Sequence, residues 1–353
     1  MIDRLLGCML AVFIVAVSVS SAAHADPVDD IVNADMARQQ IPGAAIAVVK
    51  DGKIIKEAGY GLANLEHQVA VTPATVFQSG SLGKQFTAAL VLLLASDGKL
   101  TLDDPISRHL PATPPAWKKI TVRHLLNHTA GLRDPDDIIK TNQDYTDAQL
   151  QRAGSKLPLQ WAPGTRWAYS NFGYQLLGII CTRVGGKHYG EQLRERIFEP
   201  AGMQARIISE RDIVRHRAAG YDVVDGAFKN QEWVSPTLNT TADGSLYLTA
   251  RDLAQWHIAL DGDTVLGAAL KQAMWTPTTL RDGSTKAYGF GWETSPTLGR
   301  TSVWHDGAWQ GFTTQGTRFI DDKLAVVVLT NRSGTDIGKL LELVAAHYLG
   351  TAR

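Results

Sequence analysis

The stretch of residues 44–60, AAIAVVKDGKIIKEAGY, contains two apolar runs that meet at Asp51-Gly52. An Asp-Gly dipeptide between apolar runs is a strong signal for a two-residue β-hairpin, so the pattern predicts strands at 44–50 and 53–60. The segment before them, residues 26–40, has the pattern of a helix. The first part of the chain is therefore expected to supply a helix and a hairpin.

The far end of the chain repeats this pattern. Three short strands are expected, and residues 335–349 read as an amphipathic helix that closes the chain. Strands at both ends with helices between them predict an α/β (α+β) fold: an antiparallel sheet built from both chain ends and flanked by helices, with an inserted mainly helical region. The expected strands are 301–305, 313–320 and 323–330, and the expected helices between the ends are 83–97, 121–128, 171–184, 189–198 and 249–260.

The sequence shows no internal repeat and no low-complexity linker. We therefore expect a single catalytic domain over residues 26–353. Its sheet-containing part is expected at 26–80 and 285–353, and its mainly helical part at 81–284.

Charge and composition narrow the classes of ligand. The 353 residues are 44% hydrophobic, and 35 basic residues balance 35 acidic ones without a long run of either sign. Such a chain lacks the electrostatic footprint of a nucleic-acid or anionic-membrane binder. A small-molecule or peptide substrate is the better expectation.

The N-terminus has the form of a secretory signal peptide. Arg4 precedes an apolar run at 5–19 and the small-x-small sequence Ala23-His24-Ala25, so we expect residues 1–25 to be removed and the protein to be periplasmic or secreted. The apolar run is shorter than the roughly 20 residues that span a bilayer, which argues against stable membrane insertion. Loss of Cys8 would leave Cys181 alone, without an intramolecular disulfide.

The segment Ser81-Leu82-Gly83-Lys84 precedes a long apolar helical run. Positions i and i+3 of a helix share a face, so the Lys84 amine can approach the Ser81 oxygen. A serine is a weak nucleophile until a neighbouring base takes its proton. The pattern is common by itself, and its interpretation depends on the segments below.

Two further segments can complete such a site. Tyr169-Ser170-Asn171 precedes an apolar helix, and a phenol at a helix start can relay a proton if a cation lowers its pKa. His305-Asp306-Gly307-Ala308 begins at the end of the expected strand 301–305, where Gly307 would let a bound substrate approach the backbone. Backbone amides at that point can stabilise an oxyanion.

Together these segments resemble the serine β-lactamase and penicillin-binding-protein superfamily, whose first motif is Ser-x-x-Lys. The sequence is most similar to the family of class C β-lactamases, D-alanyl-D-alanine carboxypeptidases, D-aminopeptidases and related esterases, which implies a β-lactamase-like fold. The resemblance covers nearly all of residues 26–353. It includes 77–87 (FQSGSLGKQFT), 98–105 (GKLTLDDP), 125–132 (LLNHTAGL), 163–165 (PGT), 197–203 (IFEPAGM) and 305–312.

The resemblance implies roles for individual residues. It makes Ser81 the acylated nucleophile, with Lys84 and Tyr169 sharing the removal and return of its proton, and it leaves open which of these two is the principal base. It also implies an oxyanion hole formed by the backbone amides of Ser81 and Ala308. The substrate-binding residues that it implies are Asn171, His305 and Gly307.

One position departs from the β-lactamase pattern, because this chain has His305 where those enzymes have a lysine in the third motif. Imidazole has an ordinary pKa of about 6.5 and offers less positive charge at neutral pH than an ammonium. Asp306 adds a negative charge if its side chain faces the cleft. Both features disfavour an anionic substrate and favour the peptidase and esterase branches of the family.

His124 and His128 are spaced i, i+4 and share one face of the expected helix. Leu125 stands where a His-Glu-x-x-His zinc site needs its glutamate, so we expect structural roles for both histidines, no metal and no cofactor. Trp309 adjoins the third motif and is a candidate for a cleft wall. Trp233 is equally well explained as a packing residue.

These observations predict an exported serine hydrolase that forms an acyl-enzyme on Ser81 with an ester or amide, of the esterase or D-amino-acid peptidase/carboxypeptidase type. Two alternatives stay open: a β-lactamase, and a catalytically silent module that binds penicillin or peptidoglycan fragments. The presence of Ser81, Lys84 and Tyr169 together favours the enzyme, because a binding module needs no activated nucleophile. The sequence does not determine the oligomeric state.

Overall fold

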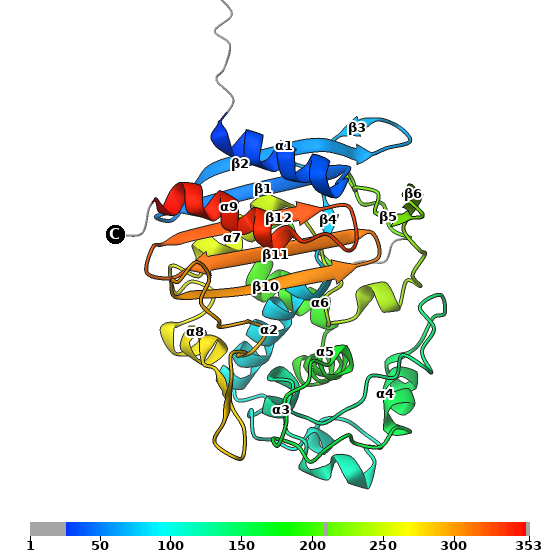
Figure 1. The fold of residues 1–353 in the computed structure, drawn as a ribbon. Coiled ribbons are helices and arrows are strands. Elements are labelled where there is room, and N and C mark those ends of the chain that lie inside the picture. Colours follow the sequence, from blue (N-terminus) through cyan, green and yellow to red (C-terminus); the bar gives the residue numbers. More distant parts are fainter. Residues whose placement is uncertain (1–25, 208–210, 351–353) are drawn as a thin grey trace, which may run out of the picture.

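The computed structural model of the protein describes residues 26–207 and 211–350 (Figure 1). The expected signal peptide at 1–25, with Cys8, lies outside the described residues. Cys181 is buried inside a helix, and burial raises the pKa of its thiol to about 12. A buried, protonated thiol is unreactive.

The described residues contain a six-stranded antiparallel sheet with the order β10-β11-β12-β1-β2-β3. The three C-terminal strands lie beside the N-terminal hairpin, so both chain ends build one sheet (Figure 1). The expected α/β (α+β) architecture is confirmed. The strands are β1 (Gly43–Lys50), β2 (Lys53–Asn64), β3 (Val69–Ala70), β10 (Ser302–Trp309), β11 (Phe312–Phe319) and β12 (Leu324–Thr330).

The hairpin turn forms where the sequence predicted it. Asp51 and Gly52 have φ angles of 49° and 73°, so both central residues adopt the left-handed conformation of a type I′ turn. This turn sets the register in which Lys50 pairs with Lys53.

Strand β1 is buried on both faces, because successive side chains of a strand point to opposite sides of the sheet. One set of its side chains packs under helices α1 (Pro27–Gln39) and α9 (Ile337–Leu349), which cover the front of the sheet in Figure 1. The other set faces the main core and helix α7 (Ala250–Ala259), which lies behind the sheet. The two sets are Ala44, Ile46 and Val48, and Ala45, Ala47 and Val49.

The inserted region is mainly helical, as expected, and lies below the sheet in Figure 1. Its α-helices are α2 (Lys84–Ser96), α3 (Val122–Leu126), α4 (Asp147–Ser155), α5 (Asn171–Gly185), α6 (Tyr189–Leu193) and α8 (Ala268–Trp275). Short turns of other helix types are η1 (Gly80–Gly83), η2 (Ile106–Arg108), η3 (Pro115–Lys119), η4 (Arg194–Phe198) and η5 (Leu238–Thr240). The short strands are β4 (Phe77–Gln78) with β7 (Tyr247–Leu248), β5 (Tyr221–Val224) with β6 (Ala227–Asn230), and β8 (Thr278–Thr279) with β9 (Thr285–Lys286).

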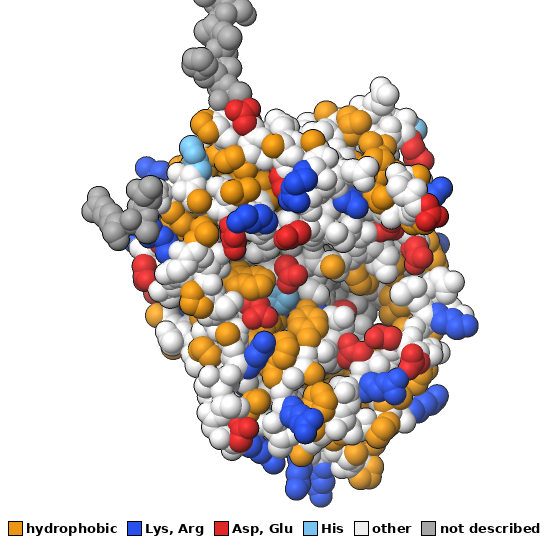
Figure 2. All heavy atoms as spheres, viewed as in Figure 1, with side chains coloured by type: hydrophobic (Ala, Val, Ile, Leu, Met, Phe, Trp, Pro, Cys, Tyr) orange, Lys and Arg blue, Asp and Glu red, His pale blue; other side chains and the backbone are white. Residues whose placement is uncertain are grey.

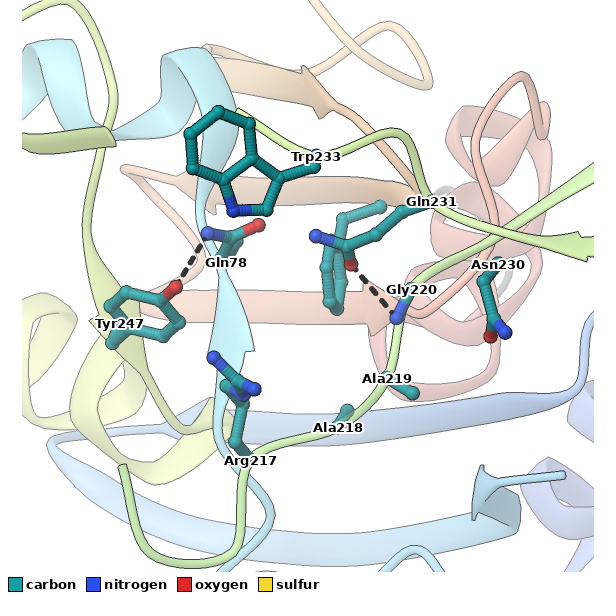
Figure 3. Close-up of a pocket in the computed structure, with 10 residues that line it drawn as sticks. Gln78, Arg217, Ala218, Ala219, Gly220, Asn230, Gln231, Trp233 and Tyr247 are labelled. Atoms are coloured by element: carbon teal, nitrogen blue, oxygen red, sulfur yellow. Dashed lines mark hydrogen bonds between the residues drawn. The ribbon is translucent and has the colours of Figure 1, made fainter. Parts of the chain in front are cut away.

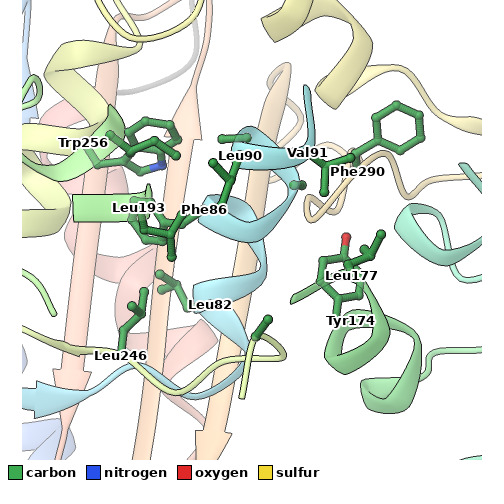
Figure 4. Close-up of a cluster of buried hydrophobic side chains, with 14 of the residues drawn as sticks. Leu82, Phe86, Leu90, Val91, Tyr174, Leu177, Leu193, Leu246, Trp256 and Phe290 are labelled. Carbon is green, nitrogen blue, oxygen red and sulfur yellow. The ribbon is translucent and has the colours of Figure 1, made fainter. Parts of the chain in front are cut away.

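Helix α2 runs through the middle of the main core (Figure 4). Its Phe86 is fully buried, with ring centroids 5.4 Å from Phe198 and 5.0 Å from Trp256. Aromatic pairs at these spacings add to the stability from buried area. The packing fixes the start of α2, which carries the first motif.

None of the helices within 26–207 and 211–350 is long and apolar enough to cross a membrane.

Candidate active site

Ser81 lies in the 3-10 turn η1, which leads directly into α2. The turn places positions 81 and 84 on one face, and Lys84 Nζ donates to Ser81 Oγ at 3.0 Å. The Ser-x-x-Lys spacing therefore brings the hydroxyl and the amine together without help from a distant loop.

The Lys84 ammonium is completely buried and has three hydrogen-bond acceptors. Besides Ser81 Oγ, it donates to Asn171 Oδ1 at 2.8 Å and to the carbonyl oxygen of Asp243 at 2.5 Å. Burial lowers the pKa of Lys84 to about 8, although the negative charges of nearby carboxylates, Asp243 first, oppose the shift. Near neutral pH a substantial fraction of this amine can therefore give up its proton.

Tyr169 precedes α5, and its ring centroid lies 4.8 Å from Lys84 Nζ. Burial raises the pKa of its phenol well above the ordinary value, and a hydrogen bond with the Ser81 side chain only partly opposes this. The condition stated from the sequence, a phenol whose pKa a cation lowers, is therefore not met. Tyr169 stays a neutral phenol in contact with the serine.

Asp134 holds the second motif, Tyr169-Ser170-Asn171, in place. Its carboxylate accepts hydrogen bonds from Ser170 Oγ at 2.5 Å and from the backbone N–H of Asn171 at 2.8 Å. Burial raises the pKa of Asp134, while these hydrogen bonds act in the opposite direction. The carboxylate thereby fixes the start of α5, from which Asn171 reaches Lys84.

The third motif, His305-Asp306-Gly307-Ala308, lies inside the edge strand β10, which continues to Trp309. The expected strand end at His305 is wrong, because the ladder with β11 pairs every residue from Ser302 to Trp309. Alternation along the strand buries His305 and leaves the Asp306 side chain 64% exposed on the opposite face.

Two glycines let β10 approach the nucleophile turn. A Cβ on Gly307 would stand 2.1 Å from the carbonyl oxygen of Ser79, and one on Gly80, which has a φ of 53°, would stand 2.7 Å from the backbone nitrogen of Ala308. Glycine is therefore required at position 307 because η1 approaches the strand closely. From the sequence we expected it for a different reason, which was the approach of a bound substrate to the backbone. The approach brings the backbone nitrogen of Ala308 next to the turn that carries Ser81.

His305 is buried and belongs to a chain of hydrogen-bonded side chains. Its Nε2 lies 3.0 Å from the hydroxyl of Tyr288, which also lies 3.1 Å from His128 Nε2 and makes a hydrogen bond with Tyr174. Its Nδ1 lies 2.5 Å from the carbonyl oxygen of Asp306. Burial lowers the pKa of His305 to about 4, the Asp306 carboxylate opposes this shift, and the Lys84 charge adds to it. The third motif therefore carries no cation at neutral pH.

His124 and His128 do not share a helix face. Helix α3 ends at Leu126, and His128 has a left-handed φ of 59°. The His124 ring closes the capping box of α3 with Thr121. No group of three His, Cys, Asp or Glu side chains within the described ranges is arranged to hold a metal ion.

The structure thus gathers Ser81, Lys84, Tyr169 and Asn171, and brings His305, Gly307 and Ala308 to the same place from the other end of the chain. Figure 2 shows a hollow on this face, between the sheet and the helical region. Sequence reasoning missed three contributors, which are Asp134, Asp243 and Tyr288. None of them lies in a motif named from the sequence, and only Asp134 lies close to one, two residues after LLNHTAGL.

Comparisons with known proteins point in one direction. A family model described as Beta-lactamase matches residues 28–348. Penicillin-binding protein 4* of Bacillus subtilis is 31% identical over 336 residues, which cover 88% of this chain and 73% of that protein. D-aminopeptidase of Gluconobacter oxydans is 30% identical over 328 residues, which cover 89% of this chain and 61% of that protein.

Solved structures show the same likeness. An octameric penicillin-binding protein homologue from Pyrococcus abyssi superposes with a TM-score of 0.81 at 28% identity, covering 92% of this chain and 77% of that one. D-amino acid amidase from Ochrobactrum anthropi SV3, complexed with L-phenylalanine, gives a TM-score of 0.80 at 25% identity, with 91% and 98% covered.

Proposed function

The chain belongs to the beta-lactamase family of serine hydrolases, and we propose that it hydrolyses esters or amides through a covalent acyl-enzyme on Ser81. The observation that carries this proposal is the 3.0 Å contact between Lys84 Nζ and Ser81 Oγ inside a site where burial lowers the pKa of the amine to about 8. An amine in that state is a competent base for a serine hydroxyl at neutral pH.

Lys84 is the principal base in this proposal. A neutral amine has two N–H donors and one lone pair, so Lys84 can keep its bonds to Asn171 and Asp243 while it accepts the Ser81 proton. Tyr169 is less suited to that step, because the pKa of its phenol is raised well above 10. The phenol instead passes the proton onward to the leaving group.

The reaction proceeds in two balanced halves. Ser81 Oγ bonds to the carbonyl carbon while its proton moves to Lys84, and the electron pair of the C=O bond moves to oxygen. The amides of Ser81 and Ala308 hold this oxyanion. Collapse breaks the bond to the leaving oxygen or nitrogen, which takes the proton from the Lys84 ammonium through Tyr169. In the second half, the oxygen of a water molecule bonds to the acyl carbonyl carbon while Lys84 takes a proton from the water. Collapse breaks the ester bond to Ser81, and Ser81 Oγ takes that proton back.

The substrate class is proposed to be D-amino-acid amides, D-peptides or related esters. The relatives include a D-aminopeptidase and a D-amino acid amidase. A neutral His305 supports the choice over a dedicated β-lactamase, since it supplies no fixed positive charge to the carboxylate of a β-lactam. Asn171 and the edge of β10 at Gly307 are the proposed contacts for the substrate backbone.

The decisive experiment is intact-mass analysis after incubation with a fluorophosphonate and, separately, with benzylpenicillin. We expect one adduct on the wild-type protein and none on Ser81→Ala, with Ser333→Ala as a matched control that still reacts. No adduct on the wild type, or an undiminished adduct on Ser81→Ala, would refute the mechanism. A stable penicillin adduct without turnover of D-amino-acid anilides, p-nitrophenyl esters or nitrocefin would instead identify a binding module.

We also propose export to the periplasm or the medium, with a mature chain that forms one catalytic domain from Asp26. N-terminal sequencing of the protein recovered from fractionated cells tests this proposal. Recovery of intact Met1 in the cytoplasmic fraction would contradict it.

A further inference from the structure

A cavity of about 230 Å³ lies near the Trp309 end of β10, between β4, β7 and the backbone of residues 217–220 (Figure 3). Gln78 and Tyr247 form one side of it, and the Trp233 indole covers it in the view of Figure 3. Gly220 forms the opposite wall, where its N–H donates to Gln231 Oε1 at 3.0 Å. The walls are therefore fixed by strand pairing and hydrogen bonds.

The cavity adjoins the nucleophile. Gln78 precedes Ser81 by three residues, and three residues of chain span at most about 10 Å. Asn239 Oδ1 also links the two sites, since it accepts from Gln78 Nε2 at 3.5 Å and from Trp309 Nε1 at 2.9 Å. Trp309 directly follows Ala308, so the cavity wall and the proposed oxyanion hole are connected by one network.

The cavity lies on the acyl side of the scissile bond. The proton for the leaving group comes from Lys84 through Tyr169, and the Tyr169 ring lies near His305, with centroids 6.2 Å apart. The leaving group therefore occupies the His305 end of β10. The acyl group must extend in the opposite direction along the strand, towards Trp309 and the cavity.

Two side chains give this cavity a chemical preference. Arg217 is exposed, extends into the space below Gln78 in Figure 3, and takes part in none of the ion pairs of the described residues. Trp233 is 57% exposed, which decides between the two interpretations left open from the sequence in favour of a groove residue. A guanidinium beside an accessible indole suits a carboxylate carried on a short chain, because the planar fork of arginine binds both carboxylate oxygens.

We propose that this cavity is an acyl-side subsite for a carboxylate, which Arg217 binds and Trp233 covers. The inference rests on the proposed acyl transfer at Ser81 and names its substrate class: D-amino-acid derivatives whose acyl part carries a negative charge about one residue before the scissile carbonyl. The preference complements the uncharged third motif, since the site then selects an anion on the acyl side rather than on the leaving-group side.

The test measures binding without turnover, in the Ser81→Ala protein. N-succinyl-D-alaninamide carries the carboxylate, and N-succinamyl-D-alaninamide is its uncharged counterpart. Titration calorimetry should show at least tenfold tighter binding of the succinyl compound. Arg217→Gln should abolish this preference and Arg217→Lys should keep part of it. Arg215→Gln should leave it unchanged, because Arg215 lines a neighbouring cavity instead.

Equal affinities for the two compounds, or a preference that survives in Arg217→Gln, would overturn the subsite. These results do not depend on catalysis, so they are separate from a failure of the proposed function, which would appear as no adduct on wild-type Ser81. In the active protein, the ratio of kcat/KM values for the two corresponding 4-nitroanilides should fall about tenfold in Arg217→Gln, with the uncharged substrate unaffected.

Discussion

The hydroxyl oxygen of Tyr288 lies 3.0 Å from Nε2 of His305. The backbone N–H of Ser170 donates to His128 Nδ1, so the proton of that ring is on Nε2 and is donated to Tyr288. The Tyr288 hydroxyl also makes a hydrogen bond with Tyr174, so its own proton has two acceptors, His305 Nε2 and the Tyr174 oxygen. This network does not by itself fix the charge of His305. Burial does, because it lowers the pKa of the ring to about 4.

Tyr288→Phe should leave the pKa of His305 well below 6.5. The variant removes the hydroxyl that contacts Nε2, while the burial of the ring and the charges of Asp306 and Lys84 are unchanged, and burial is the main cause of the low pKa. We therefore expect His305 to stay neutral at pH 7 in the variant as in the wild type.

Histidine NMR titration of the wild type and the variant measures this pKa. Tyr60→Phe is the control, because it removes a mostly buried phenol oxygen under α1, where it contacts Asp29. A His305 pKa near 6.5 in Tyr288→Phe would show that the Tyr288 hydroxyl, and not burial, keeps the ring neutral.

Asn171→Asp should shift the rise of the acylation rate with pH to a higher pH. The new carboxylate would lie about where Asn171 Oδ1 accepts from Lys84 Nζ at 2.8 Å, and an opposite charge at that distance favours the ammonium. If Lys84 must be neutral to act, acylation rises with pH through its pKa of about 8, and the variant shifts this rise upward by about 1–3 units.

The rate of acylation by a fluorogenic ester across pH 6–11 gives the readout. Asn64→Asp, on strand β2, is the matched control and should leave the profile in place. A lower rate with no displacement along the pH axis would mean that Lys84 is not the base.

Gly307→Ala should separate β10 from the nucleophile turn. The added methyl group would stand 2.1 Å from the Ser79 carbonyl oxygen, so the strand or the turn must move. Displacing one oxyanion donor costs about 10²–10³-fold in kcat in other hydrolases, and we expect a loss of that size here. Gly267→Ala should be neutral, because no atom lies within 4 Å of its added methyl group and its φ is −64°. Full activity in Gly307→Ala would remove Ala308 from the proposed oxyanion hole.

His257 should contribute to loss of stability in acid. It is buried between α7 and β11, and burial lowers its pKa to about 3, with the Arg318 charge adding to the shift. The unfolded chain binds this proton near pH 6.5 and the folded protein does not, so stability falls as the pH drops from 6.5 towards 3. Between pH 7 and pH 5 the loss from this group alone is about 2 kcal/mol.

Urea unfolding at both pH values measures that difference. His257→Gln should reduce the loss of unfolding free energy between pH 7 and pH 5 by about that amount, whatever its effect on stability at pH 7. An identical loss in variant and wild type would show that His257 titrates normally in the folded protein.

Much of the fold and part of the site could be predicted from local sequence. The Asp51-Gly52 turn, the apolar run of β1 and the helix after Lys84 each form from interactions between near neighbours, and all three are present. The spacing of Ser-x-x-Lys follows helix geometry, and the other two motifs could be recognised from the family resemblance. The end of β10 was placed wrongly, because its pairing with β11 overrides the local preference of Asp306-Gly307.

The sequence by itself determined the chain order of these elements and the chemistry that Ser81 and Lys84 can perform. The tertiary structure decided the protonation states of Lys84 and His305, and it formed the cavity that we propose as a subsite. Lys84 loses its usual pKa because folding buries it, while Asn171 and Asp243, far from it in the chain, accept its hydrogen bonds. His305 is neutral because folding buries it, and Arg217 lines a cavity that the pairing of β4 with β7 helps to form. Desolvation and hydrogen bonding depend on contacts between residues far apart in the chain, and local sequence carries no record of them.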